Sequence, residues 1–138
     1  MNSSTQRDLA LLIARVGLGV VFVAHGWQKF FTTGLDNVTT GFRGMDIPAP
    51  RASAIFAAAV ELGGGIALIA GVLTSIAGLL LFANMLGAFA FVHIENGVFV
   101  SGGGYELVVA LGVGALLIAV TGAGKFSIDA SFGKAVRV

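Results

Sequence analysis

Four long apolar segments constrain the fold of this chain more than any other feature of its sequence. They lie at about residues 9–31, 52–73, 76–94 and 105–120. A helix that crosses the hydrocarbon core of a bilayer needs about 20 largely apolar residues. A helix of a soluble bundle would instead show polar residues at helical spacing on its outer face, and these segments show no such face. We therefore predict an integral membrane protein that crosses the bilayer about four times.

The composition excludes several other classes of protein. Hydrophobic residues make up 57% of the 138 residues and charged residues 11%, whereas a soluble domain carries about 25% charged residues. So few charges cannot cover the surface of a water-soluble globule. The net charge of +1 provides no basic field that would attract nucleic acid. The absence of cysteine excludes disulfides, thiolate metal sites and a dithiol redox centre in this chain.

The predicted fold class is all-α, with one domain over residues 1–138 and four antiparallel helices in an up-down-up-down membrane bundle. The first apolar segment exceeds the roughly 7–15 apolar residues of a signal peptide, so we expect it to remain as a span. An even number of spans places both termini on the same side. A small excess of basic residues on that side favours cytoplasmic termini. The terminal side carries Arg7, Lys125, Lys134 and Arg137, and the opposite side carries Lys29, Arg43 and Arg51.

The connections between the spans are short or rich in turn residues. Residues 32–52 are polar, contain two prolines and are predicted to form a loop. Thr74 and Ser75 leave room only for a tight turn between the second and third spans. Small residues that recur four apart allow two helix backbones to approach closely. They predict helix contacts at Ala83/Gly87 and Ala110/Gly114.

Ionisable side chains inside the apolar segments indicate a site. Each costs roughly 2.5–3.5 kcal/mol near the bilayer centre, so such residues persist when they are paired or have a task. At about 1.5 Å per residue, most of these side chains fall toward the outer end of the bundle, with Glu61 near the midplane and Arg15 in the inner half. The candidate ligand-binding residues are Arg15, His25, Lys29, Glu61, His93 and Glu106.

The roles of individual residues stay open at this point. Arg15 either extends to the inner headgroups or pairs with Glu61 or with an anionic ligand. Glu61 cannot reach water, so it is paired with a cation (Arg15, Lys29 or a histidine), protonated, or facing a pocket. His25 and Lys29 are four residues apart and share a helix face. Asn84 is expected to form a hydrogen bond to another helix.

Two histidines on different helices raise the question of a metal. His25 and His93 could ligate a haem from both sides, and with Glu61 and Glu106 they could hold a metal ion. Both histidines are expected at the rim of the bundle, and no further pattern supports a cavity of haem size. No metal site is therefore predicted, and His93, close to Glu95, is interpreted as an interfacial hydrogen-bonding residue.

Four stretches of the sequence resemble the DoxX family of small bacterial membrane proteins. RVGLGVVFVAHGWQKFF (15–31) is similar to the opening signature of the family, with its arginine, glycine-bearing run and His-Gly-x-x-Lys element. GMDIPAP (44–50) and VELGGGIALIAGVLT (60–74) follow in the family order. GAGKFSIDASF (122–132) is similar to its closing element, at Gly122, Gly124, Ser127 and Asp129. Together the resemblance covers about residues 9–132.

This resemblance implies a four-helix bundle in a bacterial cytoplasmic membrane, associated with redox or sulfur metabolism. Members of the family include the small subunit of thiosulfate:quinone oxidoreductases and a mycobacterial membrane component that links superoxide removal to thiol homeostasis. By position, Arg15, His25, Lys29, Glu61 and the Ser127/Asp129 tail correspond to the family pattern. The resemblance assigns them no catalytic roles.

These observations lead to two functional hypotheses. In the first, the chain is the membrane subunit of a redox-associated complex that binds a quinone or a small oxyanion in a polar intramembrane pocket, where histidine and carboxylate transfer protons. In the second, it is a non-catalytic scaffold or assembly protein whose buried charges are structural ion pairs.

The expected partners are the lipid bilayer and other proteins of a membrane complex or further copies of the chain, with no nucleic acid. Whether the chain is itself an oxidoreductase stays open. A small transporter is a weaker interpretation, because four short spans leave little room for alternating access.

Overall fold

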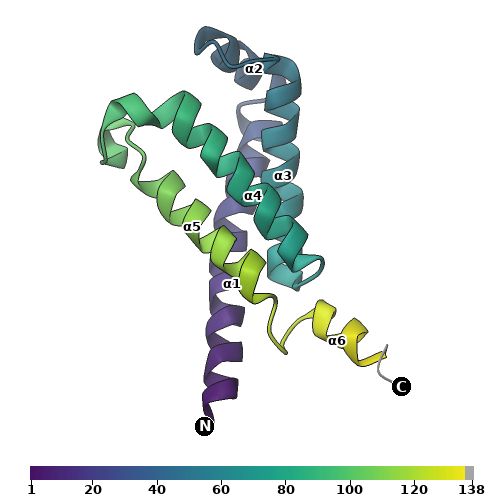
Figure 1. The fold of residues 1–138 in the computed structure, drawn as a ribbon. Coiled ribbons are helices and arrows are strands. Elements are labelled where there is room, and N and C mark those ends of the chain that lie inside the picture. Colours follow the sequence, from purple (N-terminus) through teal and green to yellow (C-terminus); the bar gives the residue numbers. More distant parts are fainter. Residues whose placement is uncertain (136–138) are drawn as a thin grey trace.

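The computed structural model describes residues 1–135 and is helical over nearly all of that range, with no strand among the described residues (Figure 1). The predicted all-α class is therefore confirmed. Arg137, one of the basic residues used to predict the topology, lies outside the described residues. The elements in chain order are α1 (Ser3–Trp27), the π-helix η1 (Gln28–Thr32), α2 (Leu35–Gly44), α3 (Pro50–Ala70), α4 (Thr74–Ala88), the π-helix η2 (Phe89–His93), the 3-10 turns η3 (Ile94–Asn96) and η4 (Val100–Gly102), α5 (Glu106–Thr121) and α6 (Ile128–Ala135).

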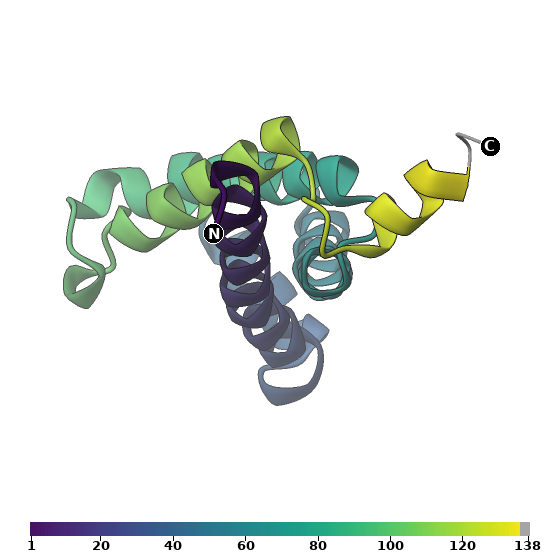
Figure 2. The ribbon, with the colours of Figure 1, turned by 90° about the horizontal axis from the view of Figure 1, so that it is seen from below.

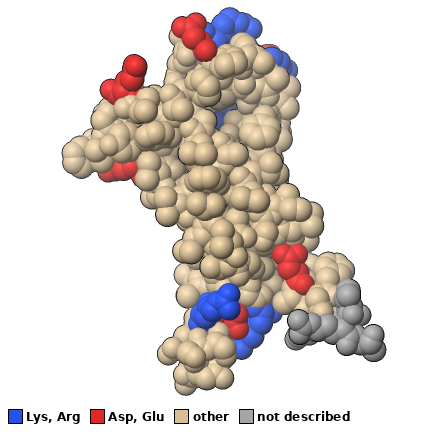
Figure 3. Space-filling model, viewed as in Figure 1, with Lys and Arg blue, Asp and Glu red and all other residues tan. Residues whose placement is uncertain are grey.

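Three of the four predicted spans correspond to helices that are long and apolar enough to cross a membrane. They run over Ser3–Thr32, Pro50–Ala70 and Thr74–Asn96. The fourth, α5, has 16 residues, which gives a length of about 24 Å. This is shorter than the roughly 30 Å of a hydrocarbon core. Figure 3 shows charged side chains gathered at the two ends of the molecule, with a wide uncharged band between them.

The long helices pack as two pairs. α1 lies against α3, and α4 forms a hairpin with α5 that is inclined to the first pair (Figures 1 and 2). The buried core lies where the two pairs meet, and each of the four helices contributes to it. Its most buried members include Phe22, Leu68, Leu81, Ala115 and Ile118.

Glycines set the spacing within each pair. A Cβ added at Gly19 of α1 would lie 2.7 Å from the carbonyl oxygen of Gly65 on α3, and one at Gly78 of α4 would lie 2.8 Å from the carbonyl oxygen of Ala115 on α5. Both distances are too short for any side chain, so the backbones are in direct contact.

The predicted small-residue contacts were mostly wrong. Ala83 and Ala110 are exposed, and a Cβ added at Gly87 would meet no atom within 4 Å. Of the predicted positions, only Gly114 lies against another helix, where a Cβ would approach Leu18 of α1 to 3.0 Å. Spacing of four marks a helix face, but the sequence does not say which face meets a neighbour.

The prediction that residues 32–52 form a loop was also wrong, because they contain α2. Its threonines and asparagine bond to carbonyls four residues back, as Thr39 Oγ1 does to Leu35 (2.7 Å) and Asn37 Nδ2 to Thr33 (2.8 Å). The tight turn between the second and third spans lies earlier than predicted, at Gly71–Leu73, and Thr74 is the first residue of α4. Gly71 and Leu73 there have φ of 70° and 47°.

Candidate functional site

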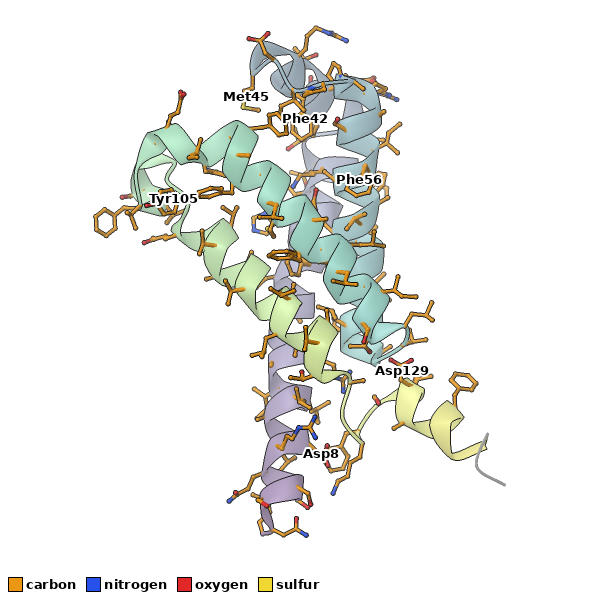
Figure 4. All side chains as sticks on the ribbon, in the orientation of Figure 1. Asp8, Phe42, Met45, Phe56, Tyr105 and Asp129 are labelled. Atoms are coloured by element: carbon orange, nitrogen blue, oxygen red, sulfur yellow. The ribbon has the colours of Figure 1, made fainter. Side chains whose placement is uncertain are left out.

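A cavity of about 580 Å³ lies between α3 and α4 at the end of the molecule that carries α2. Most of its wall is apolar, and α2 with the following turn covers it. Figure 4 shows Phe42 and Met45 below α2 and Phe56 on α3, all three of which line the cavity. The side chains that bring polar atoms to the wall are Lys29, Ser53, Glu61, Asn84 and His93.

Three of these side chains form one hydrogen-bonded cluster across three helical segments. Lys29 Nζ lies 2.6 Å from Glu61 Oε2, and Asn84 Nδ2 donates to Glu61 Oε1 at 3.0 Å. Only 5% of the Glu61 side chain and 21% of the Lys29 side chain is exposed. Each carboxylate oxygen therefore has a donor, as a buried carboxylate requires. The cation that pairs with Glu61 is thus Lys29, and the predicted hydrogen bond from Asn84 to another helix is confirmed.

Both π-helices contribute to this cavity. Lys29 lies in η1, which continues α1, and His93 lies in η2, which continues α4. A π turn inserts one extra residue and so rotates the next residues about the helix axis, and such turns occur frequently at functional sites. No sequence signal predicted these two π turns, because neither QKFFT nor FAFVH contains a glycine or proline that would mark an irregular turn.

His93 joins the cavity wall to the loop before α5. Its Nδ1 lies 2.6 Å from the carbonyl oxygen of Gly103. A carbonyl oxygen can only accept, so Nδ1 carries the proton. The other nitrogen, Nε2, has no hydrogen-bond partner among the described residues and is an acceptor in the neutral ring. The predicted interfacial hydrogen-bonding role of His93 fits this bond, although His93 also lines the cavity.

Arg15 lies against the C-terminal end of α3, away from this cluster. Its Nη1 donates to the carbonyl oxygen of Leu68 at 2.9 Å, and its Nη2 donates to that of Phe126 at 2.6 Å. The side chain is fully buried. Arg15 therefore satisfies carbonyls at the C-terminal end of α3 and connects α1 to the segment before α6.

Asp129 completes this second cluster from the start of α6. Its carboxylate accepts from the backbone N–H of Leu73 (2.8 Å) and of Thr74 (3.0 Å), so it caps α4, whose own N-cap residue offers no side-chain acceptor. Figure 4 shows Asp129 beside the turn between α3 and α4. Partial burial acts to raise the pKa of Asp129, but the hydrogen bonds from Thr74 and Leu73 and the charge of Arg15 outweigh it and hold that pKa below its ordinary value.

The remaining predicted site residues lie outside the cavity. His25 is half-buried on α1, one turn before Lys29. Glu106 is exposed, and its Oε1 accepts from the backbone N–H of Val100 at 3.2 Å. The six predicted residues are thus divided among separate places, with Lys29, Glu61 and His93 brought together. Among the described residues, no three His, Cys, Asp or Glu side chains are placed to hold a metal ion.

Comparison with known proteins places the chain in a family. Residues 10–94 match the DoxX family model. The chain is 30% identical to the inner membrane protein YqjF of Escherichia coli (strain K12) over 123 residues, which cover 88% of this chain and 91% of YqjF. It is also 33% identical to "Putative oxidoreductase CatD" of Bacillus subtilis (strain 168) over 95 residues. These residues cover 69% of this chain and 66% of CatD. No solved structure matches the chain. The family match covers more than half of the sequence and agrees with the long apolar helices of the fold, so the chain is a membrane protein of the DoxX family.

Proposed function

We propose that this chain is the membrane subunit of a redox-associated complex and binds the head group of a quinone in the cavity between α3 and α4. The observation that carries the proposal is the cavity itself, in which apolar walls surround the cluster of Lys29, Glu61 and Asn84. A volume of about 580 Å³ lies within the roughly 300–1,000 Å³ typical of small-molecule sites, which combine apolar walls with a few polar groups.

The charge balance of the cluster favours a neutral ligand over an oxyanion. Lys29 is in direct contact with Glu61, so the pair carries no net charge when both groups are ionised. A small oxyanion would meet the negative Glu61 beside the one basic group of the cavity wall. A quinone carbonyl needs only a hydrogen-bond donor, which Lys29 can supply, and its ring fits between apolar walls. Reduction of a quinone takes up protons, and the Glu61 carboxylate and the His93 imidazole are groups that transfer protons.

The redox association has independent support from a relative. CatD is named "Putative oxidoreductase", and the four stretches of this chain that resemble the DoxX family link it to a group with a quinone-linked member. Since the chain has no cysteine, it has no thiol redox centre, and electrons would come from a protein partner in the membrane.

The proposal includes a topology. We place residues 1–138 in one DoxX-like transmembrane domain with spans at about 9–31, 52–73, 76–94 and 105–120, an antiparallel four-helix bundle in the bacterial cytoplasmic membrane with both termini in the cytoplasm. The short α5 would then cross where the bilayer is thinned, or with its flanking loop partly immersed.

Binding measurements on the purified protein test the proposed function. The protein in lipid nanodiscs is titrated with menaquinone-4 and, separately, with thiosulfate. We expect saturable binding of menaquinone-4 and none of thiosulfate, with affinity at least about tenfold weaker in Lys29→Met and in Glu61→Gln. Lys29→Met removes the donor to the quinone carbonyl, and Glu61→Gln weakens the charge-assisted hydrogen bond that holds Lys29 in place. Glu106→Gln is the matched control, since Glu106 does not line the cavity. The proposal fails if menaquinone-4 does not bind, or if both cavity variants bind it as the wild type does.

A second candidate function is a non-catalytic scaffold. The observation in its favour is that the two buried charged side chains of residues 1–135, Arg15 and Glu61, both have hydrogen-bond partners within the protein. A scaffold predicts that Lys29→Glu lowers the amount of protein in the membrane and that Lys29→Glu with Glu61→Lys restores it, while no quinone binds. Quinone binding that depends on Glu61 would exclude a purely structural role.

A further inference from the structure

The shape of the cavity follows from how α3 and α4 separate. At one end the two helices are joined by the turn at Gly71–Leu73, where Arg15 and Asp129 hold that turn in place. From there α4 leans away from α3 toward the α2 end (Figure 1), and the cavity lies between the two helices where they are farther apart. The residues that α3 and α4 turn toward this gap are mostly small, so side chains do not fill it. They include Ala52, Ala57, Ala83, Gly87 and Ala88.

Charged side chains lie at the inner end of the gap, and exposed phenylalanines lie at its rim. Glu61 is 5% and Lys29 21% exposed in their side chains, whereas Phe56 is 47% and Phe91 51% exposed, and all four line the cavity. Figure 3 shows a hollow below α2 in which a basic side chain is visible. The opening therefore lies on the side of the molecule.

The end of the cavity that faces the membrane surface is covered. Phe42 of α2 and Met45 and Ile47 of the following turn line it there, and Ile47 is buried. The exposed phenylalanines at the lateral rim would contact lipid in a chain that spans the bilayer. A water-soluble ligand would have to cross this apolar rim, whereas a lipid-soluble ligand is already dissolved beside it.

We propose that the ligand enters this cavity sideways from the bilayer, through the opening between α3 and α4, and that its apolar tail stays in that opening. The inference rests on the proposed function and adds to it the route by which the ligand enters and the position of its tail. The head reaches Lys29 at the inner end, and the tail lies between Phe56 and Phe91 at the rim.

One experiment tests the position of the opening without any quinone. The single tryptophan of the chain, Trp27, is changed to phenylalanine, and a new tryptophan is introduced by Phe91→Trp. We expect lipids with brominated acyl chains to quench its fluorescence as strongly as that of the lipid-side reference Val113→Trp. Aqueous iodide should quench only the water-side reference Asn37→Trp. Iodide quenching of Phe91→Trp that equals that of Asn37→Trp would overturn lateral entry.

A second experiment tests the route with a bulky side chain at the opening. Ala83 is exposed and lines the cavity, while Ala110 is exposed on α5 and does not. In nanodiscs, Ala83→Phe should slow the association of menaquinone-4 at least about fivefold, and Ala110→Phe should leave it unchanged. Menadione, which has no tail, should bind at least about tenfold more weakly than menaquinone-4 at equal concentration in the membrane.

The outcomes separate the two proposals. Equal association rates in Ala83→Phe and Ala110→Phe, with tight binding retained, would overturn lateral entry and leave quinone binding standing. No binding of menaquinone-4 to the wild type would overturn the proposed function, and the bromolipid quenching would still decide whether the opening faces the bilayer.

Discussion

At the scale of single residues, the buried charges of this chain divide into two clusters with different tasks. The cluster of Arg15 and Asp129 satisfies backbone groups at the ends of α3 and α4. The cluster of Lys29, Glu61 and Asn84 lines a cavity. The first has an evident structural reason, because helix ends carry unsatisfied N–H and C=O groups. The second has polar groups turned toward an apolar space, which is the arrangement of a binding site.

The first prediction concerns Asp129 and pH. A carboxylate whose folded-state pKa is depressed contributes stability above its ordinary pKa, and this contribution is lost as the pH falls through the folded-state pKa. Asp129→Asn should therefore lower the melting temperature at pH 7, with a loss of about 1 kcal/mol typical of a weakened helix cap. The difference from the wild type should shrink below about pH 4.

Thermal unfolding in detergent at several pH values checks this prediction. Asp36→Asn is the control, because Asp36 is exposed on α2 and its ion pair with Arg51 is at the surface, where such pairs contribute little. A difference between Asp129→Asn and the wild type that stays constant down to pH 3 would contradict the role given to the Asp129 charge.

The second prediction concerns the Lys29–Glu61 pair. Lys29→Met leaves the Glu61 carboxylate buried without its cation, which costs about 3–5 kcal/mol for a fully buried pair and less here because Lys29 is partly exposed. The double variant Lys29→Met/Glu61→Gln removes the unpaired charge and should recover much of the loss. A double-mutant cycle of unfolding free energies in detergent measures this coupling. Additive effects of the two substitutions would show that the pair is not coupled.

At the scale of secondary-structure elements, glycines decide how closely the helices approach. Gly19 of α1 touches the backbone of α3, while a Cβ at Gly17 on the same helix would meet no atom within 4 Å. The two positions lie two residues apart and differ only in the surroundings that they face, so they form a matched pair for a test.

The third prediction uses this pair. Gly19→Ala should force α1 and α3 apart and lower stability by about 1–3 kcal/mol, the usual cost of overpacking. Gly17→Ala should have no destabilising effect, because alanine has the higher helix propensity. Melting temperatures of the two variants in the same detergent make the comparison. Equal melting temperatures would mean that α1 and α3 do not pack through Gly19.

At the scale of the whole molecule, the proposed topology connects the cavity to one side of the membrane. The N-terminus and α6 lie at the end of the molecule opposite α2 (Figure 1). If both termini are cytoplasmic, α2 and the cavity lie in the outer half of the bilayer, and the quinone enters from the outer leaflet.

The fourth prediction is therefore a pattern of reporter activities. Green fluorescent protein at the C-terminus should be fluorescent and alkaline phosphatase at the same position inactive, because alkaline phosphatase folds only after export. Alkaline phosphatase inserted after Asp46, in the exposed turn between α2 and α3, should be active. An active C-terminal alkaline phosphatase fusion would reverse the orientation and move the cavity to the cytoplasmic half.

The sequence by itself determined the class of the protein and the positions of its long helices. A chain with long apolar runs and only 11% charged residues cannot cover a water-soluble surface, so composition and segment length are sufficient for that prediction. The sequence also identified the residues that carry buried charge, since each is costly in lipid wherever it points. It limited the partners of Glu61 to a few cations without choosing among them.

Only the tertiary structure decided which of these charges meet. Arg15 and Lys29 are both on the first span, but Arg15 lies against the C-terminal end of α3 and Lys29 lies against its middle, beside Glu61. The choice of Lys29 as the partner of Glu61 depends on the direction in which α3 returns beside α1. The cavity arises because α4 leans away from α3, and the angle between two helices depends on contacts of specific faces, such as that of Gly64 on α3 with Leu81 on α4. No local pattern in the sequence encodes that angle, because it is a property of pairs of residues that are distant along the chain.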